Sequence, residues 1–266
     1  ENKKYKNNIF KVLPSFQELM NFYKRYTNNN ELEVWSELSK IPNVLDNSVK
    51  NDIESVLEVM MDRVIHNLDI ITQELTGFGY QFDNIKHNGK LLFSEKEGTY
   101  NLASKGQPEK IIELEKYLKS FGYLPLSVLK LYERIDNIDL VGDFVHWKNR
   151  NVLMDPMVII NIDTLKIMNN PEPFQDSKDR FYVYFSPDEY AKEDVSGSGV
   201  YGIYLNKDRK IDSTLFGFGK QITFVNYLRL SFKWGGFPSF EWINEQEVPS
   251  DIIKLIRNMR TKLKSI

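Results

Sequence analysis

An apolar stripe in residues 48–75 constrains the fold of this chain more than any other feature of its sequence. The spacing of three and four residues places the members of the stripe on one face of a helix. They are Ile53, Val56, Leu57, Met60, Val64, Leu68 and Ile71. Asn47 or Ser48 is suited to cap the start of this helix, and Gly77 is expected to end it. The sequence therefore predicts a long amphipathic helix in the first half of the chain.

Shorter segments flank this helix. The segment that begins at Pro14 has helical spacing as far as Tyr23, and a second short helix is expected over residues 32–38. Between residues 78 and 106, glycines separate short aromatic runs, and Asn88-Gly89 is typical of a hairpin turn. The sequence is compatible with either a small hairpin or an irregular loop in that segment.

From residue 107 onward the pattern passes from helices to strands and back to helices. Helices are predicted over 108–121, 126–132, 223–232 and from Pro249, and strands over 158–160, 181–185 and 200–204. This order predicts an α+β fold, with a helical N-terminal part at 1–106 and an α+β domain at 107–266. Because residues 78–106 hold too few apolar side chains for a core of their own, we expect one continuous unit.

Composition excludes several classes of chemistry. The chain has no Cys, so it has no disulfides, thiolate zinc sites, iron–sulfur clusters or cysteine nucleophiles. Its three His are not spaced as metal ligands, and we expect neither a metal nor a cofactor. No apolar run approaches the roughly 18 residues that span a membrane, so no membrane partner is expected.

Three local patterns also fail to match a catalytic motif. Gly217-Phe218-Gly219-Lys220 lacks the leading glycine of a phosphate loop and is followed by Gln221. Ser196-Gly197-Ser198-Gly199 does not form the Gly-x-Ser-x-Gly motif. The carboxylates between Asp136 and Asp143 do not have the spacing of a calcium loop. A hydrolase that uses two carboxylates stays open, since such a pair is defined in space.

Charge is distributed unevenly along the chain. The net charge of −2 argues against a nucleic-acid partner. Residues 136–200 nevertheless carry 12 acidic and 6 basic side chains, whereas residues 201–266 carry 6 acidic and 11 basic ones. Two solvated faces would explain this pattern. The functional interpretation is an acidic surface that docks a basic protein partner.

The acidic segment supplies candidate docking residues from two loops. Loops at one end of a sheet converge, so we expect these residues to form one rim, with two aromatic side chains as anchors. The candidates are Asp139, Asp143, Trp147, Asp188, Glu189, Tyr190, Glu193 and Asp194.

Several short motifs resemble known bacterial proteins. The stretch Gly122–Tyr132, with Leu124-Pro125 before a short helix, resembles the SUKH superfamily, as does Ile138-Asp139-Leu140-Val141-Gly142. Residues 155–159 and 198–203 look like strands of a group of uncharacterised bacterial proteins. The most specific part of that similarity is residues 223–229 followed by Trp234-Gly235-Gly236-Phe237-Pro238.

The resemblance implies a bent, mostly antiparallel sheet flanked by helices. It implies cytoplasmic bacterial proteins, many of them immunity proteins that neutralise toxins, and hence a non-enzymatic toxin-immunity or regulatory module with a basic toxin domain as its partner. A structural scaffold whose N-terminal helices oligomerise is a further alternative. The resemblance carries over no catalytic residue, and the positions that match its motifs are interpreted as fold determinants. These positions are Leu124, Pro125, Gly142, Trp234, Gly235, Gly236 and Phe237. For the Trp234–Pro238 turn, an aromatic ligand platform is the alternative.

Overall fold

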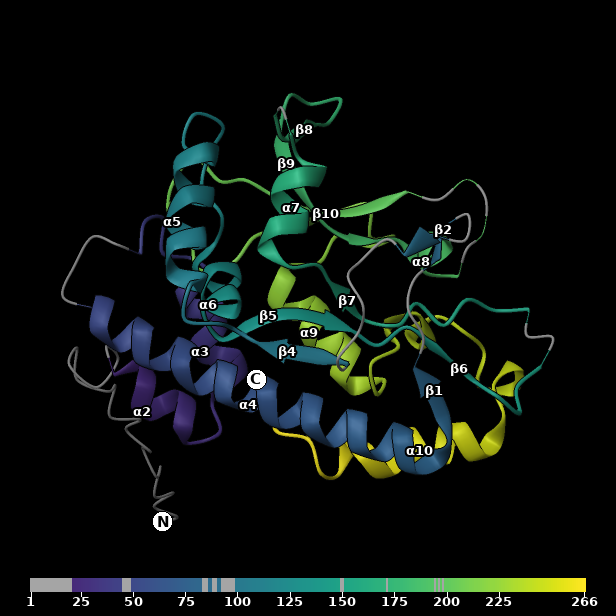
Figure 1. Cartoon of the computed structure of the whole chain (residues 1–266). Coiled ribbons are helices and arrows are strands. Elements are labelled where there is room, and N and C mark those ends of the chain that lie inside the picture. Colours follow the sequence, from purple (N-terminus) through teal and green to yellow (C-terminus); the bar gives the residue numbers. More distant parts are fainter. Residues whose placement is uncertain are drawn as a thin grey trace, which may run out of the picture.

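The long helix α4 (Lys50–Phe78) runs along one side of the molecule, beneath the strands in Figure 1. The computed structural model describes residues 21–44, 49–82, 86–87, 90–91, 99–148, 151–170, 172–193, 195, 197 and 199–266. The apolar stripe of α4 is buried along its whole length, so the predicted amphipathic helix is confirmed.

The predicted end of α4 is wrong by two residues. The helix continues through Gly77 to Phe78, and Gly79 takes the left-handed conformation with a φ of 89°. The Gly79 N–H donates to the carbonyl of Thr76 and closes the helix. A glycine inside a helix costs only about 1 kcal/mol, so Gly77 is tolerated there. The predicted caps, Asn47 and Ser48, lie outside the described residues.

Two short helices precede α4, and the first packs against the start of α4, where the Phe22 N–H donates to Asp52. They are α2 (Phe22–Thr27) and α3 (Glu31–Leu38). Asn21 caps α2 by accepting a hydrogen bond from the Lys24 N–H. The predicted opening of this segment at Pro14 lies outside the described residues.

The second part of the chain supplies the remaining helices. They are α5 (Gln107–Leu118), α6 (Leu126–Arg134), α7 (Ile162–Met168), α8 (Glu189–Lys192), α9 (Phe224–Lys233) and α10 (Ser250–Arg260), with the 3-10 helices η1 (Pro238–Glu241) and η2 (Glu245–Glu247). The sequence pattern predicted α5, α6, α9 and α10. It did not predict α7 or α8, because neither is long enough to show a helical period.

The strands form several small antiparallel sheets. The largest has the order β11 (Leu215–Phe216), β10 (Val200–Tyr204), β9 (Phe181–Pro187), β8 (Phe174–Gln175). A second has the order β4 (Tyr100–Leu102), β5 (Ile135–Asp139), β7 (Val158–Ile159). The two-stranded pairs are β1 (Tyr80–Phe82) with β6 (Gly142–Phe144), and β2 (Lys86–His87) with β3 (Lys90–Leu91).

The α+β fold class is confirmed. Within the described part, helices dominate the N-terminal region and every pair of strands is antiparallel. The Ile160 N–H donates to the Phe185 carbonyl at 3.0 Å and joins the two larger sheets at the end of β7. The β2–β3 pair flanks the predicted hairpin turn, whose residues Asn88 and Gly89 are themselves outside the described residues.

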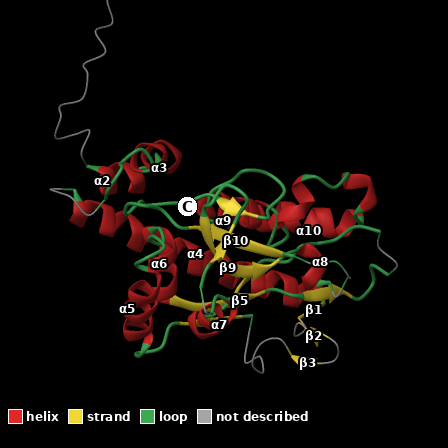
Figure 2. Cartoon of the chain, turned by 90° about the horizontal axis from the view of Figure 1, so that it is seen from above, coloured by secondary structure: helices red, strands yellow, loops and turns green. Residues whose placement is uncertain are grey.

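The hydrophobic core is continuous across residue 106. Trp35 in α3 donates its indole N–H to the buried carboxylate of Asp212 at 3.1 Å. Arg63 in α4 donates to the Ser265 carbonyl at 2.8 Å. Figure 2 shows α4 between the N-terminal helices and the strands. That the two parts do not fold separately stays a prediction, which limited proteolysis near residue 106 would test.

The turn after α9 needs glycine at two positions. Gly235 and Gly236 have φ values of 63° and 98°. A Cβ atom on Gly236 would lie 2.7 Å from the Leu140 Cδ1 atom. Phe237 is fully buried, and the Trp234 indole donates to the Glu241 carboxylate at 2.6 Å. The turn thus packs against the core.

The other motif positions also lie at packed sites. Leu124 and Pro125 are buried where α6 begins, and Pro125 has the extended backbone of a helix cap. Gly142 in β6 lies so close to β1 that a Cβ atom would be 2.2 Å from the Gln81 carbonyl oxygen. In the described residues, no helix combines the length and the apolar character needed to cross a membrane.

Candidate functional site

The acidic segment between β9 and β10 contains the short helix α8, where the sequence predicted a loop. Asp188 caps this helix: one carboxylate oxygen accepts from the Ala191 N–H at 2.9 Å. Its other oxygen accepts from the Gly199 N–H at 2.5 Å. Both ends of the segment are therefore held by one side chain.

A buried ion pair fixes the far end of α8. The Lys192 Nζ atom lies 2.5 Å from Asp155 Oδ1, and the two side chains are 0% and 2% exposed. Asp155 has a φ of 50°, a left-handed conformation that is strained for a residue with a Cβ atom. Burial raises the pKa of Asp155 to about 6, while the charge of Lys192 acts in the opposite direction. The Lys192 ammonium thus opposes the effect of burial and favours the ionised carboxylate.

Tyr201 in β10 extends this pair to a second carboxylate. Its hydroxyl donates to the Glu189 carboxylate and lies 3.2 Å from Asp155 Oδ2. The Lys192 ammonium is 4.8 Å from the centre of the Tyr201 ring. Burial and the nearby carboxylates raise the pKa of Tyr201, so the hydroxyl keeps its proton.

Asp155 and Glu189 lie close together and are therefore candidates for the carboxylate pair of a two-carboxylate hydrolase. Two carboxylates that share a hydrogen-bond donor, one with a raised pKa, are a pattern of acid–base sites. Asp155, however, is 1% exposed and already bonded to Lys192. Neither of the two pockets described below includes Asp155, Glu189 or Tyr201. This geometry suits the positioning of α8 better than attack on a substrate.

Two aromatic side chains are exposed beside this network. Tyr190 in α8 and Trp242 after η1 are 44% and 42% exposed. The Trp242 ring lies 5.5 Å from Phe218, which in turn lies 5.1 Å from Tyr201. We call Asp188, Glu189, Tyr190 and Trp242 the α8 surface. Trp242 was not predicted, because a single aromatic residue in an irregular segment has no periodicity to reveal it.

A second set of contacts links the other predicted residues to η1. Glu193 accepts a hydrogen bond from the Met154 N–H at 2.7 Å. The Ser239 hydroxyl in η1 donates to the Met154 carbonyl at 2.7 Å. Next to Ser239 in η1, Phe240 contacts Trp147 with ring centres 6.1 Å apart. Glu193 and Trp147 are thus held by the same segment.

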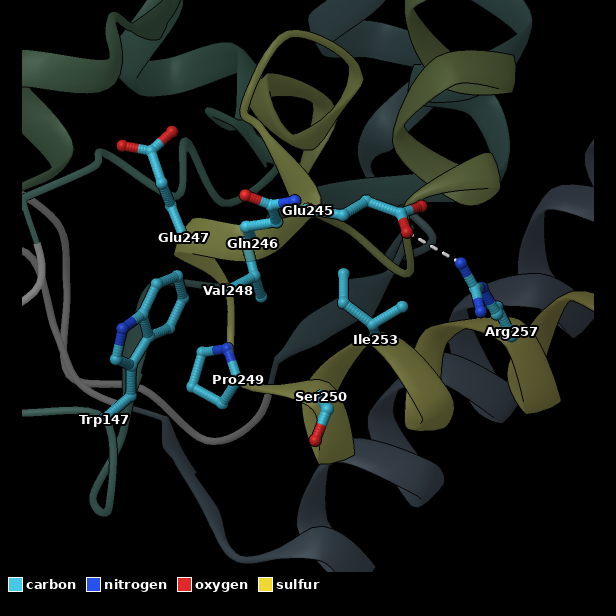
Figure 3. A pocket seen from close by; sticks show the side chains of 9 residues that line it. All are labelled: Trp147, Glu245, Gln246, Glu247, Val248, Pro249, Ser250, Ile253 and Arg257. Carbon is cyan, nitrogen blue, oxygen red and sulfur yellow. Dashed lines mark hydrogen bonds and ion pairs between the residues drawn. The ribbon is translucent and has the colours of Figure 1, made fainter.

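Trp147 also forms one wall of an open pocket of about 700 Å³. Figure 3 shows the pocket between Trp147, η2 and the start of α10. Its lining residues are Trp147, Glu245, Gln246, Glu247, Val248, Pro249, Ser250, Ile253 and Arg257. Arg257 pairs with Glu245 at 2.7 Å, and Glu247 forms no ion pair with a described residue. The pocket combines an apolar floor with an acidic margin.

The structure separates the predicted docking residues into groups. Asp139, predicted on an exposed rim, is only 6% exposed and accepts a hydrogen bond from the Val141 N–H, so that placement is wrong. Trp147 is 8% exposed and lines the pocket. Asp143 is exposed on β6, opposite Gln81 of β1. Asp194 lies outside the described residues.

The carboxylates of the acidic segment fall into two groups: some form ion pairs, whereas Asp136, Asp179 and the two carboxylates of α8 accept hydrogen bonds from neutral donors. Asp163 and Asp176 form ion pairs with Lys110 and Arg180. Asp188 and Glu189 instead accept hydrogen bonds from neutral donors, and within the described residues neither forms an ion pair. No ion pair with a described residue therefore offsets their negative charge.

In comparisons with protein-family models, curated proteins and solved structures, the chain has no significant match. Among the described residues, no group of three or more His, Cys, Asp or Glu side chains is arranged to hold a metal ion.

Proposed function

We propose that this chain is a non-enzymatic binding protein that docks a basic protein partner through the α8 surface. The observation that carries the proposal is the pair of carboxylates Asp188 and Glu189, which form no ion pair with a described residue and lie next to the exposed ring of Tyr190. A partner with Lys and Arg side chains supplies the missing counter-charges.

Electrostatic complementarity acts mainly on the rate and selectivity of association. The carboxylates of α8 attract a basic surface over a distance of roughly 8–10 Å at ordinary salt concentrations. Charges alone do not give a long-lived complex, because exposed ion pairs contribute little net free energy. A long-lived complex therefore also requires apolar contacts between the two proteins.

Tyr190 and Trp242 are suited to make such contacts. Both are exposed, and tyrosine and tryptophan are the residues that most often dominate the binding energy of interfaces. Each presents a rigid ring with few rotatable bonds, so little conformational entropy is lost on contact. The pocket beside Trp147 offers a further apolar recess with an acidic margin.

The buried pair of Lys192 and Asp155 supports the proposal because it fixes the position of α8. A helix as short as α8 is not stable by itself, so its position depends on tertiary contacts. The ion pair, the Asp188 cap and the Tyr201 hydrogen bond hold it from three sides. A surface that is ordered before binding loses less entropy when a partner docks.

The SUKH-like motifs extend this proposal to a cytoplasmic toxin-immunity or regulatory module, with a basic toxin domain as the partner. The test of partner identity is co-purification with the product of an adjacent toxin gene. The immunity role is supported if the two purified proteins form a 1:1 complex and if the chain protects cells from the toxin. A toxin that neither binds nor is neutralised would refute the immunity role.

The α8 surface itself is tested with matched charge variants. Glu189→Lys reverses a charge on the surface, and Glu189→Gln removes the charge while keeping an acceptor for Tyr201. Glu172→Lys reverses an exposed charge in the same acidic segment but outside the α8 surface. Slower association of both Glu189 variants, with Glu172→Lys unchanged, supports the proposal. Equal effects at both positions contradict it.

A further inference from the structure

A basic hollow lies at the opposite end of the molecule from α8. It has a volume of about 600 Å³ and lies among the C-terminal end of α5, Asn43 and the loop before Ile211. Its lining residues are Asn43, Glu115, Lys116, Lys119, Tyr123, Lys207, Asp208 and Arg209. Figures 1 and 2 both place α5 and α8 at opposite ends.

Backbone hydrogen bonds hold the walls of the hollow together. Tyr123 and Asn206 exchange a pair of N–H to carbonyl bonds at 2.8 and 3.0 Å. The Val44 N–H donates to the Arg209 carbonyl at 2.9 Å. Three segments that are distant in the sequence are therefore fixed against each other, and the hollow exists before any ligand enters.

Arg209 forms a structural wall of this hollow. Its guanidinium pairs with the Glu115 carboxylate and lies 4.5 Å from the centre of the Tyr123 ring. The pair cancels the charges of Arg209 and Glu115. The charge that a ligand meets therefore comes from the remaining side chains.

Those side chains are predominantly cationic. Lys116, Lys119 and Lys207 form no ion pair with any described residue, and Asp208 is the one further carboxylate in the lining. The negative end of the α5 dipole explains lysines at positions 116 and 119. It does not explain Lys207, which comes from a different segment and faces the same hollow. The three ammonium groups and the Asp208 carboxylate together give this lining a net charge of +2.

We propose that this hollow binds the polyphosphate group of a small organic anion. Lysine ammonium groups are common phosphate ligands, and a di- or triphosphate carries enough negative charge to match three of them. The volume falls within the range of about 300–1,000 Å³ that accommodates small organic ligands. A nucleoside triphosphate is an anion of this class, and the proposal is independent of the function proposed for α8.

Isothermal titration calorimetry of the full chain with ATP and with inorganic triphosphate tests this site. We expect one site per chain for ATP, with weaker binding at higher salt. The combined variant Lys116→Gln, Lys119→Gln, Lys207→Gln should weaken binding by about tenfold or more. The control Lys254→Gln changes an exposed lysine of α10, outside the hollow, and should leave binding unchanged.

The arms of this experiment separate the sources of the phosphate group. Tighter binding of ATP than of triphosphate supports an organic ligand. Equal affinity for the two shows that the organic group is not recognised and that the site binds free polyphosphate. Absence of binding for both at millimolar concentration overturns the site. So does an equal loss of affinity in the Lys254→Gln control. A single-stranded oligonucleotide that binds more tightly than ATP and loses affinity in the combined variant would replace the proposal with a nucleic-acid site.

Discussion

Two buried aspartates lie in different regions of the molecule and are stabilised in different ways. Asp155 lies beneath α8 and pairs with the ammonium of Lys192. Asp212 lies where α3 meets the second part of the chain, and it accepts from the neutral N–H groups of Trp35, Ser213 and Val225. Burial raises the pKa of both to about 6.

The two carboxylates are similarly buried, but their charges are compensated differently. At Asp212 several weak donors share one charge, so the loss of any one leaves the others in place. At Asp155 a single cation compensates the charge, so the loss of Lys192 leaves the buried carboxylate without a counter-charge. The region that we assign to docking is thus positioned by an interaction that is costly to break.

Replacement of Lys192 should have the largest effect. Lys192→Met leaves the Asp155 carboxylate buried without its cation, and we expect the free energy of unfolding to fall by about 3–5 kcal/mol. Chemical denaturation measures this loss. Combining the change with Asp155→Leu removes the uncompensated charge and should recover part of the stability. A loss below about 1 kcal/mol in the single variant would show that the pair does not hold α8.

The pH dependence of stability should follow from the raised pKa of Asp212. Between about pH 4 and pH 6 the folded chain holds this proton more tightly than the unfolded chain, so the contribution of Asp212 to stability increases as the pH falls. The free-energy difference between the parent chain and Asp212→Asn should therefore favour the parent by up to about 3 kcal/mol more at pH 4 than at pH 7. Urea denaturation at both pH values measures it. A difference that is constant with pH would contradict the shift.

The turn after α9, where the backbone conformation of Gly236 is the limiting feature, sharpens the comparison. Gly236→Val places a β-branched side chain at a φ of 98° and against Leu140, and we expect a loss of about 1–3 kcal/mol. Thermal unfolding measures it. Gly219→Val is the control, because a Cβ atom there would meet no neighbour within 4 Å. Unchanged melting temperatures at Gly236 would favour the ligand-platform interpretation of this turn.

Removal of one donor to Asp212 should have a smaller effect. Trp35→Phe deletes the indole N–H and leaves the backbone donors, so we expect the lost hydrogen bond to lower the unfolding free energy by about 1–2 kcal/mol. Partner binding should be retained, because α3 lies outside the α8 surface. A loss as large as that of Lys192→Met would remove the distinction between the two aspartates.

The sequence predicted the fold more fully than the site. Helical spacing identified α4 and α9, since their apolar residues repeat over several turns, and the run from Phe181 to Phe185 identified β9. The interpretation of the acidic excess as a docking surface stays a prediction. That excess did not show that Asp139 turns inward, because composition does not specify which side of a strand end faces solvent.

The buried pair could not be predicted for a different reason. Asp155 and Lys192 are separated by 37 positions, and their contact depends on how β7, β9 and α8 are packed. Neither residue belongs to a repeating pattern. Trp242 likewise gains its position from tertiary contacts, with the Phe218 ring and the Lys220 ammonium. Tertiary contacts of this kind carry no local sequence signal.

Association kinetics of the purified partner with Glu189→Lys test the docking account most directly. We predict association about tenfold slower than for the parent chain at low salt and a weaker dependence of the rate on salt. Glu172→Lys should associate at the parent rate. Identical association rates for the parent chain and Glu189→Lys at both low and high salt would contradict docking through the α8 surface.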